Sequence, residues 1–199
     1  MHAIICVLAA YPELVAWMSS SLDLDSPNTP QQALQLQFSL GYVLADTVYM
    51  FIFTPNDYLF LAHHALAGLY LVAAMAHGAG AISAILVFFL GEITGPLFSA
   101  FSIAKELRHD VLLAAKIFTW ISPAFTVAFI LVRSLVSPII IGWYLRKLLF
   151  ESAAIPFYWR IFMGSLVLAG LAGSQLWSYK LLRGFMKSWR RDRLVQKQD

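Results

Sequence analysis

Long apolar stretches separated by short polar segments dominate the pattern along this 199-residue chain. A bilayer core about 30 Å thick needs roughly 20 apolar residues of helix. By that measure the pattern predicts membrane-spanning helices at about residues 2–19, 33–53, 58–77, 81–101, 111–145 and 157–182. Pro12 and Glu13 interrupt the first of them. The chain is therefore predicted to be an all-α, multi-pass transmembrane bundle or barrel of about six spans.

The connections between these spans carry their own signals. Thr54-Pro55-Asn56-Asp57 is typical of a tight turn, because proline fixes φ and Asn and Asp bond their own backbone. Gly78-Ala79-Gly80 is so short that the third and fourth spans are predicted to form an antiparallel hairpin. The fifth stretch, residues 111–145, exceeds one upright span and contains Ser122-Pro123 and Ser137-Pro138. We predict one long, kinked span there, with two spans as the alternative.

Composition supports a membrane class and excludes others. The chain is 60% hydrophobic and 13% charged, with a mean hydropathy of +0.71, whereas a soluble domain carries roughly 45–50% and 25%. A single cysteine, Cys6, excludes an internal disulfide and a cysteine-based zinc site, and no metal site is predicted. Seven of the 14 Lys and Arg lie in residues 180–197. Residues 183–199 are thus predicted to be a basic tail at a membrane surface, and no nucleic acid partner is expected.

Charge also predicts the topology. Six spans place both termini on one side, and the Lys and Arg count makes that side cytoplasmic, together with the loop that holds Lys105 and Arg108. Two spans in residues 111–145 would instead move the N-terminus to the other side. In either case the C-terminus is expected in the cytoplasm.

Four ionisable residues lie inside the predicted spans at a similar depth. At 1.5 Å per residue, His63 and His64 lie roughly 8–9 Å below the cytoplasmic start of their span, Asp46 about 10 Å and Glu92 about 13 Å. A carboxylate bonded to one imidazole nitrogen leaves the other free as base, acid or nucleophile. We therefore predict a catalytic layer of these four residues. The alternative is that they only hydrogen-bond between helices, at about 0.6 kcal/mol on average.

The adjacent histidines cannot share one direction, because neighbouring residues of a helix are about 100° apart. We expect one imidazole to face a cavity and the other to brace a neighbouring helix. Three further residues are candidates for lipid binding. Tyr42 lies one turn before Asp46, Arg133 lies within apolar sequence where it needs an acceptor, and His77 ends its span at the opposite face.

These residues follow a known order. Gly41-Tyr42-x-x-x-Asp46, then His63-His64, then Glu92-x-Thr94-Gly95-Pro96, then Arg133, together resemble the TLC-domain family, which includes ceramide synthases and smaller TLC-domain proteins. His2-Ala3 is similar to the Ser-x-x-His-Ala stretch that begins an early span of the family. The resemblance covers most of the chain, residues 1–182. Because His2-Ala3 matches the second element of the pattern, we expect one upstream span to be absent here.

The resemblance implies a helical membrane barrel around a lipid-accessible cavity, in the endoplasmic reticulum or another endomembrane. In ceramide synthases the paired histidines serve acyl transfer, which implies acyl-CoA as a candidate co-substrate and His63 and His64 as its residues. The chain departs from those enzymes in its Glu92 element, which replaces an Asp-rich motif. In that element Gly95 stands for the usual Thr, and Phe101 falls where a basic residue is common. The chain as a whole is most similar to small members of this family that are implicated in membrane-lipid composition.

Three functions remain open on the sequence. The first is a membrane enzyme that modifies a lipid, by acyl transfer or a related step. The second is a non-catalytic protein that binds or organises lipids with the same polar layer. The third is a small transporter or proton-coupled channel, since buried carboxylates and histidines also relay protons. Membrane lipids are the expected partners, and a second copy of the chain is a candidate partner.

Overall fold

The computed structural model describes residues 2–19 and 23–195, with side chains up to residue 187. The helices are α1 (His2–Ser19), α2 (Pro30–Phe53), α3 (Tyr58–His77), α4 (Ala81–Glu92), α5 (Gly95–Leu107), α6 (Leu112–Ile130), the π-helix η1 (Leu131–Val136), α7 (Ser137–Arg146), the π-helix η2 (Lys147–Glu151) and α8 (Phe157–Val195). No β-strand occurs in the described part of the chain. Six helical stretches there are long and apolar enough to cross a membrane. The protein is an all-α, multi-pass membrane protein, as predicted.

Glu13, which interrupts the first predicted span, connects helix α1 with helix α2. Thr29 caps α2 by accepting the Gln32 amide at 3.2 Å, and the Gln32 side chain accepts the Thr29 amide at 3.1 Å. The Gln32 side-chain amide then donates to the Glu13 carboxylate at 3.0 Å. Glu13 therefore ties α1 to the start of α2.

The turn between α3 and α4 depends on its two glycines. Gly78 and Gly80 have φ values of 77° and 87°, a region that side chains disfavour. Asn28 clamps the turn from outside, donating to the Ala74 carbonyl at 2.9 Å and accepting the Ala81 amide at 2.8 Å. The two helices touch near this turn. However, α3 packs chiefly against α2 and α8, and α4 against α1, so the predicted hairpin is not the main packing unit.

The fourth predicted span is broken, which the sequence pattern did not predict. Pro96 has no N–H to donate to the carbonyl of Glu92, so the helix cannot continue regularly past that residue. The chain leaves α4 at Glu92 and starts α5 at Gly95. A Cβ atom on Gly95 would lie 2.5 Å from the Ala3 Cβ, so the restart of the helix lies directly on α1. The break places Glu92 at the end of α4.

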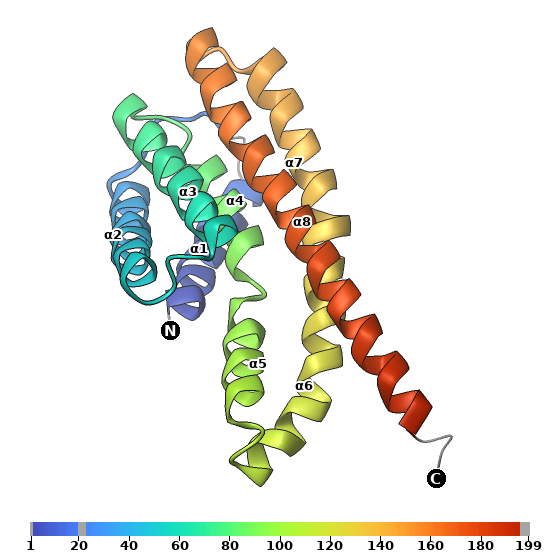
Figure 1. Cartoon of the computed structure of the whole chain (residues 1–199). Helices are drawn as coiled ribbons and strands as arrows, with labels where there is room; N and C mark the ends of the chain where they lie inside the picture. The colour runs from blue at the N-terminus through green and yellow to red at the C-terminus, as the bar shows by residue number, and fades with distance from the viewer. Residues whose placement is uncertain (1, 20–22, 196–199) are drawn as a thin grey trace.

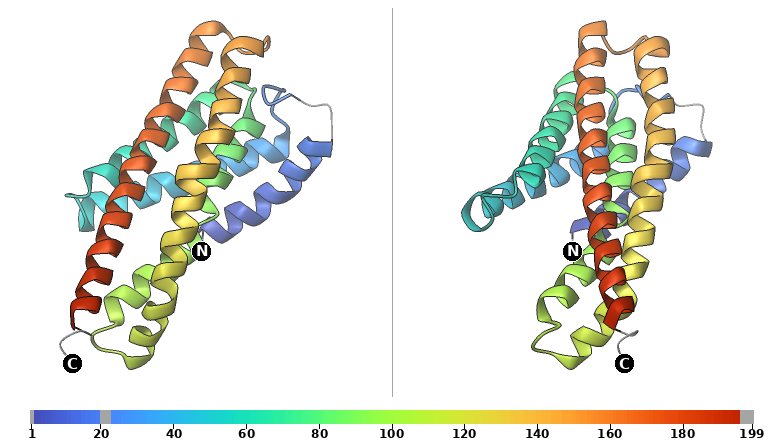
Figure 2. Two further views of the ribbon diagram at one scale, coloured as in Figure 1. Left: turned by 90° about the vertical axis from the view of Figure 1, so that its right-hand side faces the viewer. Right: turned by 45° about the vertical axis from the view of Figure 1, so that its right-hand side comes forward.

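The fifth stretch is one continuous helical segment from Leu112 to Glu151, which confirms the prediction of a single long span. It runs beyond the predicted end at Leu145 and changes pitch at η1, just before Pro138. This segment and α8 are the two longest continuous helical segments of the described chain (Figure 1). The α5–α6 pair projects beyond the ends of α1, α2 and α3, beside the C-terminal part of α8 (Figure 2).

Candidate functional site

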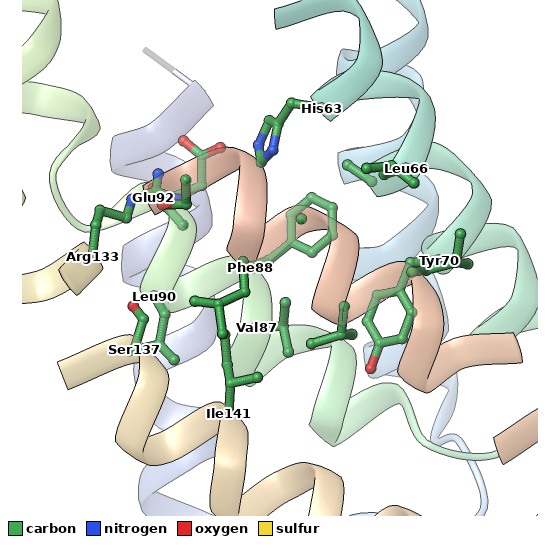
Figure 3. Close-up of a pocket in the computed structure, with 17 residues that line it drawn as sticks. His63, Leu66, Tyr70, Val87, Phe88, Leu90, Glu92, Arg133, Ser137 and Ile141 are labelled. Atoms are coloured by element: carbon green, nitrogen blue, oxygen red, sulfur yellow. The ribbon is translucent and has the colours of Figure 1, made fainter. Parts of the chain in front are cut away.

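A mostly apolar cavity lies between α3, α4, η1, α7 and α8; we call it the inner cavity. It has about 680 Å³ of space between its walls, its open mouth included. His63, Glu92 and Arg133 come from three different elements and lie close together at one end (Figure 3). Tyr70 lies toward the other end, and apolar side chains such as Leu66, Val87 and Ile141 line the wall between. The inner cavity thus combines one strongly polar end with an apolar body.

Arg133 is held in the wall of the inner cavity by its own neighbours. Its Nη2 donates to the Gly91 carbonyl, directly before Glu92. Its guanidinium carbon lies 5.4 Å from the centroid of the Phe129 ring, within cation–π range. The Arg133 Nε is buried and has no hydrogen-bond partner among the described residues. The guanidinium therefore keeps donor capacity beside the inner cavity.

The π-helix that carries Arg133 is stabilised from α8. The Ser137 amide donates to the Val132 carbonyl, one residue further back than in an α-helix, and Pro138 has no amide hydrogen. The carbonyl of Arg133 is left without a donor from its own helix. The Gln175 side-chain amide donates to it at 2.6 Å. Gln175 therefore supports the widened turn that places Arg133 at the inner cavity.

His64 is buried, with 6% exposure, and both of its ring nitrogens are engaged. Its Nε2 lies 2.9 Å from the Asp46 Oδ2 on α2, and its Nδ1 lies 3.1 Å from the Phe60 carbonyl oxygen. The Phe60 ring stacks on the imidazole at a centroid distance of 4.9 Å. Because a carbonyl oxygen only accepts hydrogen bonds, Nδ1 donates its hydrogen to the Phe60 carbonyl. Nε2 is hydrogen-bonded to the Asp46 carboxylate. His64 has no ring nitrogen left for a substrate.

His63 lies in the opposite situation. It lines the inner cavity, and no hydrogen bond or ion pair to it occurs among the described residues. Its ring lies 6.0 Å from the His64 ring, at an interplanar angle of 84°. One imidazole faces the cavity and the other braces α2, as the 100° spacing predicts. His63 therefore retains both ring nitrogens for chemistry in the inner cavity.

The predicted four-residue layer is therefore divided. Glu92 joins His63 and Arg133 at the inner cavity, whereas Asp46 belongs with His64 outside its lining. Tyr42, which is expected to face the same cavity as Asp46, lies outside the lining of the inner cavity, as Asp46 does, and stacks on His2 with ring centroids 3.5 Å apart.

His77 lies far from the other candidates. Its Nε2 lies 3.3 Å from the Ala154 carbonyl oxygen, at the opposite end of α3. Fourteen residues of helix separate it from His63, about 21 Å. His77 therefore does not share the inner cavity, in keeping with its predicted position at the opposite face, and its candidacy for lipid binding stays a separate prediction.

Three polar residues of this region were not predicted from the sequence as part of the site: Ser137, Ser174 and Gln175. The two serines line the inner cavity, and Gln175 bonds Arg133. One signal was available, because Ser174-Gln175 is a polar pair within an otherwise apolar predicted span. Ser137 precedes a proline and was interpreted only as part of a kink.

A second, wider cleft opens between α5, α6 and α8. We call it the outer cleft; it has about 2450 Å³ of space between its walls, its open mouth included. Phe60, Phe129 and Trp177 line it, and the Trp177 ring contacts the other two at centroid distances of 4.8 and 5.8 Å. Phe60 stacks on His64 and Phe129 lies under Arg133. Phe129 therefore contacts both the outer cleft and Arg133 at the polar end of the inner cavity.

Comparison with known proteins identifies the family. The chain is 34% identical over 130 residues to a TLC domain-containing protein of Arabidopsis thaliana, a match that covers 62% of this chain and 50% of that protein. The chain thus spans about half the length of the curated relative it matches. No solved structure matches it. The family model of the TLC domain matches residues 1–183, and the chain therefore belongs to the TLC-domain family.

Proposed function

We propose that this protein binds a membrane lipid in the inner cavity and transfers an acyl group to or from it, with His63 as the acid–base group. The TLC-domain family is linked to lipid metabolism. The observation that carries the proposal is the convergence of His63, Glu92 and Arg133 at the polar end of an apolar cavity inside a membrane bundle. Such a site fits an amphiphile, with its polar end at the three residues and its chain along the apolar body.

The chemical step uses His63, whose ring nitrogens have no hydrogen-bond partner among the described residues. An imidazole nitrogen of His63 removes the proton from a hydroxyl or amine of the acceptor lipid as its oxygen or nitrogen attacks the acyl carbonyl of a thioester. The new ester or amide bond forms, the carbon–sulfur bond breaks, and the same imidazole returns the proton to the leaving thiolate. General acid–base catalysis of this type contributes about 10²–10⁴-fold. Acyl-CoA is the candidate thioester.

The outer cleft supports a route for that co-substrate. Its lining includes Lys105, Arg108 and Lys180, which outnumber the carboxylates Asp57 and Glu106 and suit an anionic group, and much of the rest is aromatic. In the predicted topology these basic residues face the cytoplasm. An acyl chain that enters there would reach the inner cavity past Trp177.

A second function, lipid binding without turnover, is favoured by one specific observation. Catalytic imidazoles are usually oriented by a bond to their second ring nitrogen. Within the described residues His63 has no such partner: the Asp46 carboxylate is bonded to His64, and Glu92, although it lines the same cavity, makes no hydrogen bond to His63. On this candidate the polar end of the inner cavity would hold a head group and no bond would change.

An acyl-transfer assay separates the two functions. Purified protein in nanodiscs would receive acyl-CoA labelled in its acyl chain, with a membrane-lipid extract as acceptor. We expect labelled lipid from the wild type and from His77→Ala, the control histidine outside the inner cavity, and at least about 100-fold less from His63→Ala. Lipid that copurifies with the wild type without any labelled product would contradict catalysis and support binding alone.

A further inference from the structure

Three donor groups around the inner cavity lack acceptors. Among the described residues, four buried side-chain polar atoms have no hydrogen-bond partner, and three belong to residues that line this cavity: the Nε of Arg133 and the hydroxyls of Ser137 and Ser174. Buried polar groups in proteins are nearly always paired, so a cluster of exceptions requires an explanation. Their concentration at one cavity points to a ligand that supplies the missing acceptors.

The two serine hydroxyls differ from the other buried helical hydroxyls of the described residues, which are all paired. A hydroxyl within a helix normally donates to the carbonyl four residues earlier. That bond is present at Thr47, Thr119, Thr126, Ser165 and Ser178, at 2.6 to 3.1 Å. Ser137 and Ser174 do not make it. Both are nevertheless buried, at 3% and 5% exposure, in two different helices.

Ser137 lies one turn after a carbonyl that α8 engages. The carbonyl four residues before it belongs to Arg133, and Gln175 donates to one of the two lone pairs of that oxygen at 2.6 Å. Gln175 is the direct neighbour of Ser174, so one segment of α8 both bonds this carbonyl and supplies the second hydroxyl. Two unpaired hydroxyls from two helices thus lie at one cavity, beside the widened turn of η1.

We propose that Ser137 and Ser174 form a subsite for the carbonyl oxygen of an acyl lipid, one that carries an ester or amide bond. Each of the three unpaired groups can donate a hydrogen bond, and a carbonyl oxygen offers two lone pairs and has no hydrogen that would need a further acceptor. The formal charges of Glu92 and Arg133 cancel at the polar end, so the deeper subsite suits a neutral acceptor. This assignment rests on the proposed lipid binding and specifies the ligand.

The position of the subsite fits the order of groups in an acyl glycerol. Ser137 lies one helical turn after Arg133, about 6 Å along the axis. A glycerol hydroxyl at His63, Glu92 and Arg133 would place the linked ester carbonyl near the serines and the chain along Leu66, Val87 and Ile141. An ether-linked lipid has the same shape and chain but lacks the carbonyl oxygen.

Competition between two lipids tests the assignment. Ester-linked monooleoyl glycerol and its ether-linked oleyl analogue would each displace a fluorescent monoacyl lipid from the full chain in nanodiscs. We expect the wild type to bind the ester about ten-fold more tightly, from two neutral hydrogen bonds. The Ser137→Ala/Ser174→Ala double variant should lose this preference through weaker ester binding and bind the ether as the wild type does. Ser178→Ala is the matched control, because its buried hydroxyl is paired with the Ser174 carbonyl.

The outcomes separate the two proposals. Ester preference that persists in the double variant, or a wild type that binds both lipids equally, would overturn the carbonyl subsite and leave lipid binding intact. A wild type that binds neither lipid would overturn lipid binding itself. Thermal unfolding without lipid guards against misfolding. The double variant should unfold at a temperature no lower than the wild type, since it removes only unpaired hydroxyls.

Discussion

His63 and His64 are neighbours in the chain and lie in opposite environments. His64 is saturated, with Asp46 on one ring nitrogen, the Phe60 carbonyl on the other and the Phe60 ring on its face. His63 lines the inner cavity with Glu92 and Arg133. The difference arises from helix geometry, because a rotation of about 100° turns one side chain toward α2 and the other toward η1 and α8. A pair of histidines therefore need not be a pair of catalysts.

The surroundings of the two histidines also differ in how they are satisfied. At His64 both ring nitrogens and the Asp46 carboxylate have partners, which is typical of a structural contact between helices. Around His63 the unpaired donors of Arg133, Ser137 and Ser174 gather on one cavity. Membrane helices gain little from isolated polar contacts, about 0.6 kcal/mol on average. A concentration of unpaired donors is therefore better explained by a ligand than by packing.

The largest expected effect on stability comes from the saturated histidine. His64→Ala leaves the Asp46 carboxylate without its partner and removes a stacked ring, so we expect the free energy of unfolding to fall by about 2 kcal/mol. His63→Ala should lower it by less than half as much. Denaturant titration in mixed micelles measures both changes. Equal losses of free energy of unfolding would mean that the two side chains are anchored alike, which would contradict the contrast between His63 and His64.

A double-mutant cycle sharpens the same contrast. Asp46→Asn and His64→Ala should show a coupling energy of about 1–2 kcal/mol, because each removes the same charge-assisted bond. Asp46→Asn with His63→Ala should be additive within about 0.5 kcal/mol. Coupling of Asp46 to His63 instead would return the carboxylate to the cavity site.

Gln175 tests the support of the cavity side. Gln175→Ala removes the donor to the Arg133 carbonyl that Pro138 cannot replace, so we expect a loss of about 1 kcal/mol in stability and weaker lipid binding. Ser165→Ala on the same helix is the control, because that exposed hydroxyl donates only to the Ile161 carbonyl of its own helix. If Gln175→Ala loses stability but binds lipid as the wild type does, the widened turn has no part in the site.

The smallest expected effect concerns the ring beside His64. Phe60→Leu keeps the backbone carbonyl that bonds the imidazole but removes the stacking ring and its contact with Trp177. We expect a loss of about 0.5–1.5 kcal/mol, the usual value of an aromatic pair. Acyl transfer should change less than in His63→Ala, as measured in the same nanodisc assay. An equal loss of turnover would show that the position of His64 controls His63.

The apolar pattern predicted most of the fold, since each span must bury its backbone polar groups in its own helix. The single long segment from Leu112 to Glu151 followed from the same rule. The break after Glu92 did not, because the pattern of apolar residues continues through it while Pro96 withholds one backbone bond. Depth along the helix predicted that four ionisable residues lie in one layer, but depth gives no direction around the helix axis.

The site could be predicted only in part for the same reason. The spacing of His63 and His64 predicted that they diverge, and the structure adds which one faces the inner cavity. The donor to the Arg133 carbonyl is Gln175, 42 positions away in the chain, so no local pattern contains this contact. The contact of Tyr42 with His2 likewise depends on how α1 and α2 pack.

The separate roles of the adjacent histidines can be observed by ¹⁵N nuclear magnetic resonance of the two imidazoles. Histidine-labelled protein in nanodiscs would be titrated with monooleoyl glycerol, and His63→Gln and His64→Gln variants would assign the signals. We predict that the ring nitrogens of His63 shift with added lipid while those of His64 stay where the Asp46 bond places them. Lipid that shifts His64, or leaves His63 unchanged while it binds, would contradict the account.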